Sequence, residues 1–207
     1  MNLGFLVIFQ VSFCFFEKWL LNKYFLIIFL KNNSSNKLLK FFNKTKTSLQ
    51  NNKITQLKEV MPSEAFLTLK SQKNSVLIDV RTPSEWKNIG IVDEKSLSNP
   101  IILSSWQIPP FMEFNNNFIK EVESCLEIIF NKSFDKNNLI LFFICRVGAR
   151  SYQASQYFIN NGYININNII GGFEGEANNA GARSLISGWQ YEKLPWEKLP
   201  WKLNLNQ

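Results

Sequence analysis

The strongest constraint on the fold is an unbroken apolar run from Leu139 to Ile144, which leads directly into Cys145. Such a run is typical of a strand that is buried on both faces of a parallel sheet. Three weaker segments are also predicted to be strands: Val76–Val80, Ile101–Leu103 and Ile169–Ile170.

Helical segments alternate with these strands along the chain. The residues from Pro62 to Lys70 predict a helix, because a proline and an acidic residue stand in its first turn. A second helix is expected between Asn115 and Asn131, and a third from Arg150 to Asn160. This alternation indicates an α/β fold built on a parallel sheet.

The net charge of +7 is not spread evenly along the chain. Residues 1–58 hold nine lysines against a single acidic residue, Glu17, which gives +8 and leaves the rest of the chain at −1. A nearly neutral globular part has no electrostatic footprint for a phosphate backbone, and the lysine-rich part offers only Phe41 and Phe42 as stacking platforms. We therefore expect no nucleic-acid partner.

The N-terminal segment is first apolar and then rich in lysine and asparagine, and two interpretations of it stay open. Residues 3–30 form two apolar runs interrupted by charges, and together they have the length of one imperfect membrane-spanning helix. The lysines beyond it would place the rest of the chain in the cytoplasm. The alternative is an extension without a fold of its own. Either way we expect an extension over residues 1–53, a globular domain over 54–201 and a tail over 202–207.

Histidine is absent, which excludes nucleophiles activated by imidazole and zinc sites that use histidine. The three cysteines, Cys14, Cys125 and Cys145, form no C-x-x-C pair, so neither a disulfide framework nor a cysteine-rich metal cluster is encoded. This cysteine usage favours a reducing compartment. We expect no metal and no cofactor, and any chemistry must run without imidazole.

Cys145 stands where a buried strand passes into a helix. The start of a helix has unpaired backbone N–H groups and partial positive charge, so it stabilises an anion in the preceding loop, here a thiolate. Arginines add positive charge, and a glycine allows the tight curl that turns N–H groups inward. These features predict a loop that binds an anion around the cysteine sulfur, made of Arg146, Val147, Gly148, Ala149, Arg150 and Ser151.

The spacing from Cys145 to Arg150 is C-x4-R, one residue shorter than the C-x5-R loop of cysteine phosphatases. A shorter ring of donors suits a terminal sulfur better than a tetrahedral phosphate. The string resembles the C-x-x-G-x-R-[ST] loop of the rhodanese homology domain, whose defined positions are matched by Cys145, Gly148, Arg150 and Ser151. Further matches lie along residues 54–201: Asp79-Val80-Arg81, Pro83, Glu85, Trp86, Gly171-Gly172-Phe173-Glu174-Gly175 and Ser187-Gly188-Trp189.

The resemblance implies a rhodanese-like fold, with a parallel five-stranded sheet and helices on both faces. It implies that Cys145 accepts a sulfane sulfur from a small donor as a persulfide and passes it to a small acceptor or a sulfur-carrier protein. Asp79 and Arg81 are expected to support the loop. The second hypothesis is a rhodanese-fold module that binds sulfur or a protein without turnover, tethered to a membrane if residues 3–30 are an anchor.

Two further points concern segments outside the loop. After Trp86 the chain reads Asn88-Ile89-Gly90-Ile91-Val92-Asp93 in place of the family's I-x-G-A-x-H-I-P, which usually contributes to the substrate side, so the acceptor preference stays open. Cys125 lies on the apolar face of its predicted helix and is interpreted as a core residue, with a resolving role for Cys145 as the alternative.

Overall fold

The computed structural model describes residues 57–132 and 134–199. None of the helices in those two stretches is long and apolar enough to cross a membrane. The membrane-anchor hypothesis concerns residues 3–30, which lie outside the described residues, as do the predicted extension over 1–53 and the tail over 202–207.

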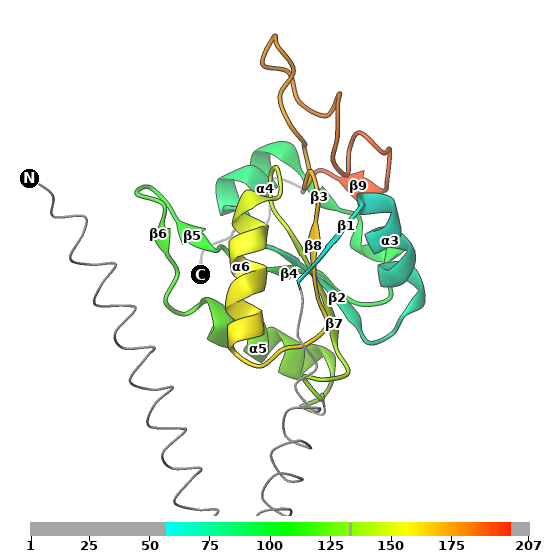
Figure 1. Cartoon of the computed structure of the whole chain (residues 1–207), viewed down its shortest axis with the longest axis vertical. Coiled ribbons are helices and arrows are strands. Elements are labelled where there is room, and N and C mark those ends of the chain that lie inside the picture. Colours follow the sequence, from blue (N-terminus) through cyan, green and yellow to red (C-terminus); the bar gives the residue numbers. More distant parts are fainter. Residues whose placement is uncertain (1–56, 133, 200–207) are drawn as a thin grey trace, which may run out of the picture. The chain divides into compact units, whose positions relative to one another are not determined.

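Five parallel strands form the central sheet, in the order β1-β8-β7-β2-β4 (Figure 1). Their bounds are β1 Lys58–Val60, β2 Ser75–Asp79, β4 Ile102–Leu103, β7 Ile140–Ile144 and β8 Ile166–Ile169. The predicted strand that leads into Cys145 is β7, which lies at the centre of the sheet with its last four residues buried. The prediction of a five-stranded parallel sheet is confirmed.

Helices cover both faces of this sheet, as predicted. They are α3 Pro62–Ser71, α4 Pro83–Ile89, α5 Phe118–Ile129 and α6 Ala149–Asn160, with a short 3-10 helix, η1, at Glu94–Ser96. Leu141 and Phe143 of β7 pack in one apolar cluster with residues of α5 and α6, whereas Phe142 and Ile144 pack in another with residues of α3. Because successive side chains of β7 enter different clusters, the strand is apolar at every position.

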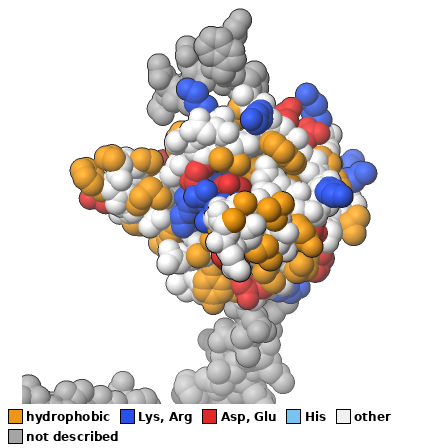
Figure 2. Space-filling view, turned by 90° about the horizontal axis from the view of Figure 1, so that it is seen from above, with side chains coloured by type: hydrophobic (Ala, Val, Ile, Leu, Met, Phe, Trp, Pro, Cys, Tyr) orange, Lys and Arg blue, Asp and Glu red, His pale blue; other side chains and the backbone are white. Residues whose placement is uncertain are grey.

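Two small antiparallel pairs flank the sheet and were not predicted. β3 (Ile91–Val92) pairs with β9 (Trp196–Glu197), and β5 (Gln107–Ile108) pairs with β6 (Glu113–Phe114). The β5–β6 hairpin projects from the domain and carries exposed apolar side chains, among them Phe111 at 82% exposure (Figures 1 and 2). Strands of two residues are too short to leave a periodic pattern in a sequence.

The carboxyl ends of β2 and β7 lie side by side, since Asp79 pairs with Ile144 in the parallel register. The Val80 N–H donates to the Ile144 carbonyl at 2.9 Å, so the pairing continues one residue beyond β2. The segment from Asp79 to Arg81 is therefore brought next to Cys145 at one edge of the sheet, where open α/β folds place their ligand sites.

Candidate active site

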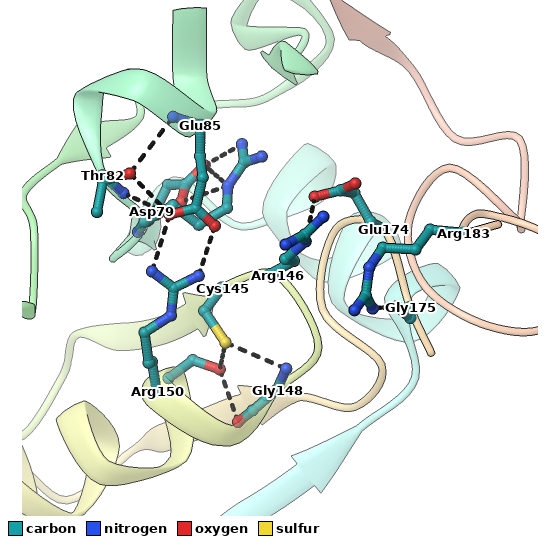
Figure 3. Close-up of polar contacts among 12 residues, drawn as sticks. Asp79, Thr82, Glu85, Cys145, Arg146, Gly148, Arg150, Glu174, Gly175 and Arg183 are labelled. Atoms are coloured by element: carbon teal, nitrogen blue, oxygen red, sulfur yellow. Dashed lines mark hydrogen bonds and ion pairs between the residues drawn. The ribbon is translucent and has the colours of Figure 1, made fainter. Parts of the chain in front are cut away.

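Cys145 follows β7 directly and is a free thiol with only 1% of its surface exposed. Its sulfur accepts a hydrogen bond from the Gly148 N–H at 3.1 Å and another from the Ser151 hydroxyl at 3.3 Å (Figure 3). Both donors belong to the loop that the sequence singles out. Two donors directed at one sulfur stabilise a negative charge on it.

Gly148 gives the loop its shape. Its φ of 103° lies in the left-handed region that favours glycine, and it forms the N-cap of α6. Within the described residues, the backbone N–H groups of four neighbours donate to no backbone or side-chain acceptor: Arg146, Val147, Ala149 and Arg150. Free N–H groups ahead of a helix and in its first turn form a binding site for an anion.

The Ser151 hydroxyl has one hydrogen and three acceptors within reach. These are the Cys145 sulfur, the Gly148 carbonyl at 3.0 Å and Oδ1 of Asn168 at 2.7 Å. A hydroxyl hydrogen rotates to the best acceptor, and hydrogen bonds to an ionised acceptor are the stronger ones. Ser151 can therefore turn its hydrogen to Cys145 when the sulfur becomes an anion, and to Asn168 when it does not.

The guanidinium of Arg150 is engaged by the carboxylate of Glu85 in α4, which binds it at two points. The two Nη nitrogens of Arg150 donate to the two carboxylate oxygens of Glu85 at 2.8 and 2.5 Å (Figure 3). Burial alone would raise the pKa of Glu85, but hydrogen bonds from Arg150 and Thr82 lower it to about 2. Burial likewise acts to lower the pKa of Arg150, yet its pairing with Glu85 raises it overall. Both partners stay ionised at neutral pH.

Glu85 is held in place by the start of its own helix. Its carboxylate accepts the Thr82 N–H at 3.0 Å and the Thr82 hydroxyl at 2.8 Å, and Thr82 Oγ1 accepts the Glu85 N–H in return. This capping box fixes the first turn of α4, and Pro83 occupies its first position. The same carboxylate thus caps one helix and orients an arginine in the first turn of α6.

Asp79 and Arg81 form a fully buried ion pair beneath the loop. The Arg81 Nη2 lies 2.7 Å from Asp79 Oδ2 and also donates to the Gly90 carbonyl at 2.7 Å. The guanidinium lies over the ring of Phe173, 4.1 Å from its centroid. Arg81 therefore joins the end of β2 to two later segments, which is the geometry of a support, and neither charge reaches solvent.

The segment from Gly171 to Gly175 supports the loop from the other side through backbone contacts. The Phe173 N–H donates to the Cys145 carbonyl at 2.8 Å, and the Glu174 N–H donates to the Arg146 carbonyl at 3.0 Å. Gly172 has a φ of 60°, and a Cβ there would overlap the Cys145 carbonyl oxygen. The backbone of this segment can approach Cys145 only because Gly172 has no side chain.

The structure brings the seven residues from Cys145 to Ser151 and the Asp79–Arg81 pair into one region. The sequence analysis matched Glu85 and Gly172 to the family without predicting that Glu85 pairs with Arg150 or that Gly172 contacts Cys145, and it did not single out Asn168, the acceptor for Ser151. Two of these residues have a visible signal in the sequence: Glu85 ends a T-P-x-E capping motif, and Gly172 belongs to a Gly-Gly pair. Among residues 57–132 and 134–199, no group of three or more Cys, Asp or Glu side chains is placed to hold a metal ion.

Comparison with known proteins agrees with this geometry. The model of the Rhodanese-like domain family matches residues 63–178, so the chain belongs to that family. Family membership supports a sulfurtransferase-type or sulfur-binding function in general terms.

Individual relatives are similar over most of the domain. An uncharacterized protein of Rickettsia conorii is 36% identical over 143 residues, which covers 68% of this chain and 98% of that protein. Rhodanese-like domain-containing protein 17 of Arabidopsis thaliana is 32% identical over 97 residues, covering 46% of this chain and 54% of that protein. The crystal structure of Rv0390 from M. tuberculosis has 28% identity and a TM-score of 0.58, and covers 68% of this chain and 97% of that one.

Proposed function

We propose that the protein is a sulfurtransferase that moves a sulfane sulfur from a small donor to a thiophilic acceptor through a persulfide on Cys145. The observation that carries the proposal is the ring of donors at Cys145. Gly148 and Ser151 already contact the sulfur, and free loop N–H groups stand next to them. This arrangement favours an anion of the size of one sulfur atom.

The proposed reaction has two displacement steps. The Cys145 thiolate attacks the outer sulfur of a donor such as thiosulfate; the Sγ–S bond forms, the S–S bond of the donor breaks, and its electron pair leaves with sulfite. A nucleophile such as cyanide or a thiolate then attacks the outer sulfur of the persulfide. A bond forms between the nucleophile and that sulfur, the Sγ–S bond breaks, and the electron pair of the Sγ–S bond returns to Cys145 as a thiolate. No external oxidant, reductant or cofactor is needed.

Proton transfer is not required in either step when the attacking and leaving groups are anions. A sequence without histidine is therefore compatible with this chemistry, which needs anion stabilisation more than a general base. The Cys145 sulfur is buried, but the outer sulfur of a persulfide stands about 2.05 Å beyond it, and that outer atom is the one transferred.

The test is mass spectrometry of the full-length protein after exposure to thiosulfate. We expect the peptide that contains Cys145 to gain about 32 Da, one sulfur atom, and to lose it with cyanide as thiocyanate appears. The variant Cys145→Ser should neither gain sulfur nor produce thiocyanate, while its unfolding curve stays close to that of the parent protein. Sulfur transfer by Cys145→Ser would refute the proposal.

The non-catalytic alternative gives a different result in the same experiment. A sulfur-binding module without turnover would gain the sulfur and retain it in the presence of cyanide and thiols. The natural acceptor, whether a small thiol or a sulfur-carrier protein, is then sought by its ability to discharge the labelled Cys145.

A further inference from the structure

Asn168 is a polar residue inside the sheet, one position before the end of β8, with only 2% of its surface exposed. In the parallel register it stands between Glu59 of β1 and Phe143 of β7. Its side chain lies on the face of the sheet that α6 covers, since Phe143 packs in the same apolar cluster as residues of α6 (Figure 1). A buried carboxamide is costly unless it is hydrogen-bonded, so its partners need a physical explanation.

The two ends of the Asn168 carboxamide have different partners. Its Oδ1 accepts the Ser151 hydroxyl at 2.7 Å, and its Nδ2 donates to Oε1 of Glu59 at 3.4 Å. A carboxylate only accepts hydrogen bonds, so the opposite orientation would place the amide oxygen against the carboxylate of Glu59. Glu59 therefore holds the carboxamide with its oxygen towards Ser151, and Asn168 can only accept there.

Asn168 and Cys145 compete for one hydrogen. The Ser151 hydroxyl is fully buried and also lies 3.3 Å from Cys145 Sγ. An ionised sulfur is the stronger acceptor, so it takes this hydrogen from Asn168. Ser151 is the one side-chain donor to Asn168 Oδ1 in the part of the chain that the structure describes. Because an unpaired buried oxygen costs free energy, Asn168 opposes negative charge on Sγ.

The charge on Sγ changes during the proposed reaction. Free Cys145 attacks as a thiolate; the Sγ–S bond forms, the S–S bond of thiosulfate breaks, and its electron pair leaves with sulfite. The negative charge of the resulting persulfide lies on the outer sulfur. Sγ is then bonded to carbon and to sulfur, and it is a weak acceptor. The Ser151 hydrogen is free to return to Asn168 in this loaded state.

We propose that Asn168 is a positioning residue that stabilises the sulfur-loaded form of Cys145, and that Glu59 sets its orientation. The proposal rests on the proposed sulfur transfer and adds two residues to it. Ser151 directs its hydrogen at Sγ in the thiolate and at Asn168 Oδ1 in the persulfide. Loading satisfies the buried carboxamide, and unloading returns the hydrogen to the sulfur.

The first experiment titrates the Cys145 thiol without any sulfur donor. Full-length variants are followed by the ultraviolet absorption of the thiolate, and each is corrected with the same variant carrying Cys145→Ala. Asn168→Leu should move the midpoint of the titration about half a pH unit lower, a change of about threefold, because nothing then draws the Ser151 hydrogen away from the sulfur except the Gly148 carbonyl. Glu59→Gln should move it in the same direction by less, since a neutral side chain no longer fixes the carboxamide.

Asn167→Leu is the matched control. Asn167 is also buried in β8, but its Nδ2 donates to the Leu141 carbonyl at 3.3 Å and not to the loop. Its variant should keep the midpoint of the parent protein, whatever its stability. The charged pairs around Cys145 are the same in every variant: Asp79–Arg81, Glu85–Arg150 and Arg146–Glu174.

The Ser151→Ala background shows whether the effect passes through the hydroxyl. The shift caused by Asn168→Leu should vanish there, and the shift caused by Glu59→Gln should shrink. Glu59 is exposed, so its variant keeps the test decisive even if Asn168→Leu does not fold. A shift that is absent from a folded variant, or that is equally large without the hydroxyl, would overturn the proposal.

Loading with sulfur separates this proposal from the proposed function. Each full-length protein is equilibrated with a fixed ratio of thiosulfate to sulfite, at a pH above every midpoint, and the loaded fraction is measured by mass spectrometry. Asn168→Leu should lower the ratio of loaded to free Cys145 about threefold, and Asn167→Leu should leave it unchanged. An equal ratio in the parent and in Asn168→Leu would overturn the proposal. If no donor loads Cys145 while its titration still depends on Asn168 and Ser151, the sulfur transfer is refuted and the competition for the hydrogen stands.

Discussion

Glu85 and Arg150 form a two-point ion pair that joins the first turn of α4 to the first turn of α6. The pair lies next to the loop that holds Cys145, and it connects two segments that are far apart in the sequence. Because Glu85 also caps its own helix through Thr82, the carboxylate links the backbone of one helix to the side chain of another. Removing its charge should therefore affect both stability and the position of Arg150.

We predict that Glu85→Gln lowers the free energy of unfolding, and that the loss depends on pH. The folded state lowers the pKa of Glu85 from 4.5 to about 2, so its contribution is fully present above the unfolded value and disappears as the pH falls through the folded one. Allowing for partial solvent screening, we expect a loss of about 2 kcal/mol at pH 7 that shrinks towards zero near pH 2.

Urea unfolding at neutral and acidic pH measures this effect. Glu127→Gln is the control, because Glu127 is exposed and has no ion pair in the described residues, so its stability difference should be small at every pH. The two measurements are made at about pH 7 and about pH 2.5, on either side of the unfolded-state pKa. If Glu85→Gln lowers the free energy of unfolding equally at both, the assigned pairing is contradicted.

Gly172→Ala should destabilise the domain and slow the charging of Cys145. The new Cβ would overlap the Cys145 carbonyl oxygen, and the left-handed φ of 60° adds strain. Gly181→Ala is a matched control: its φ is 79°, but no atom lies within 4 Å of its added Cβ. In thermal unfolding, we expect Gly181→Ala to lower the free energy of unfolding by about 1 kcal/mol through backbone strain alone. Gly172→Ala should lower it at least twice as much, because the new Cβ also overlaps a neighbouring atom. Equal costs would show that Gly172 has no packing role.

Cys125 should behave as a structural thiol. Burial, together with the nearby Glu121 carboxylate, raises its pKa, so a small fraction is thiolate at neutral pH. We expect iodoacetamide to modify Cys125 slowly at pH 7 and faster as the pH rises, when followed by peptide mapping. Cys125→Ala should reduce stability by about 1 kcal/mol and leave sulfur transfer intact. Loss of transfer without loss of stability would instead indicate a resolving role.

A chain that begins at Asn52 should fold and transfer sulfur at the rate of the full chain. All the contacts that we describe in the core and around Cys145 lie between Leu57 and residue 199. If residues 3–30 are an anchor, the full chain should sediment with membranes and resist extraction by high salt, whereas a basic extension should be released. Failure of the shortened chain to fold would contradict both the anchor hypothesis and the hypothesis of an extension without a fold of its own.

Features that are local in the sequence were predictable. The apolar run of β7, the periodicity of α5 and the glycine before α6 each act within one element, and the loop at Cys145 is contiguous. The partners that complete the site are not local: Glu85 lies 65 positions before Arg150, and Asn168 lies 17 after Ser151. Their pairing depends on strand order, which residue periodicity does not specify. β1 escaped prediction because Lys58 and Glu59 leave it a single buried residue.

The supports of Cys145 come from both earlier and later parts of the chain, and this has a consequence for biosynthesis. Translation delivers the nucleophile well before the segment from Gly171 to Gly175 that binds its carbonyl, and before β9, whose Trp196 packs on Phe173. A nascent chain that has just exposed Cys145 lacks these partners, so the loop around the thiol is not yet supported. Under the proposed function, sulfur transfer begins only after almost the entire domain has left the ribosome.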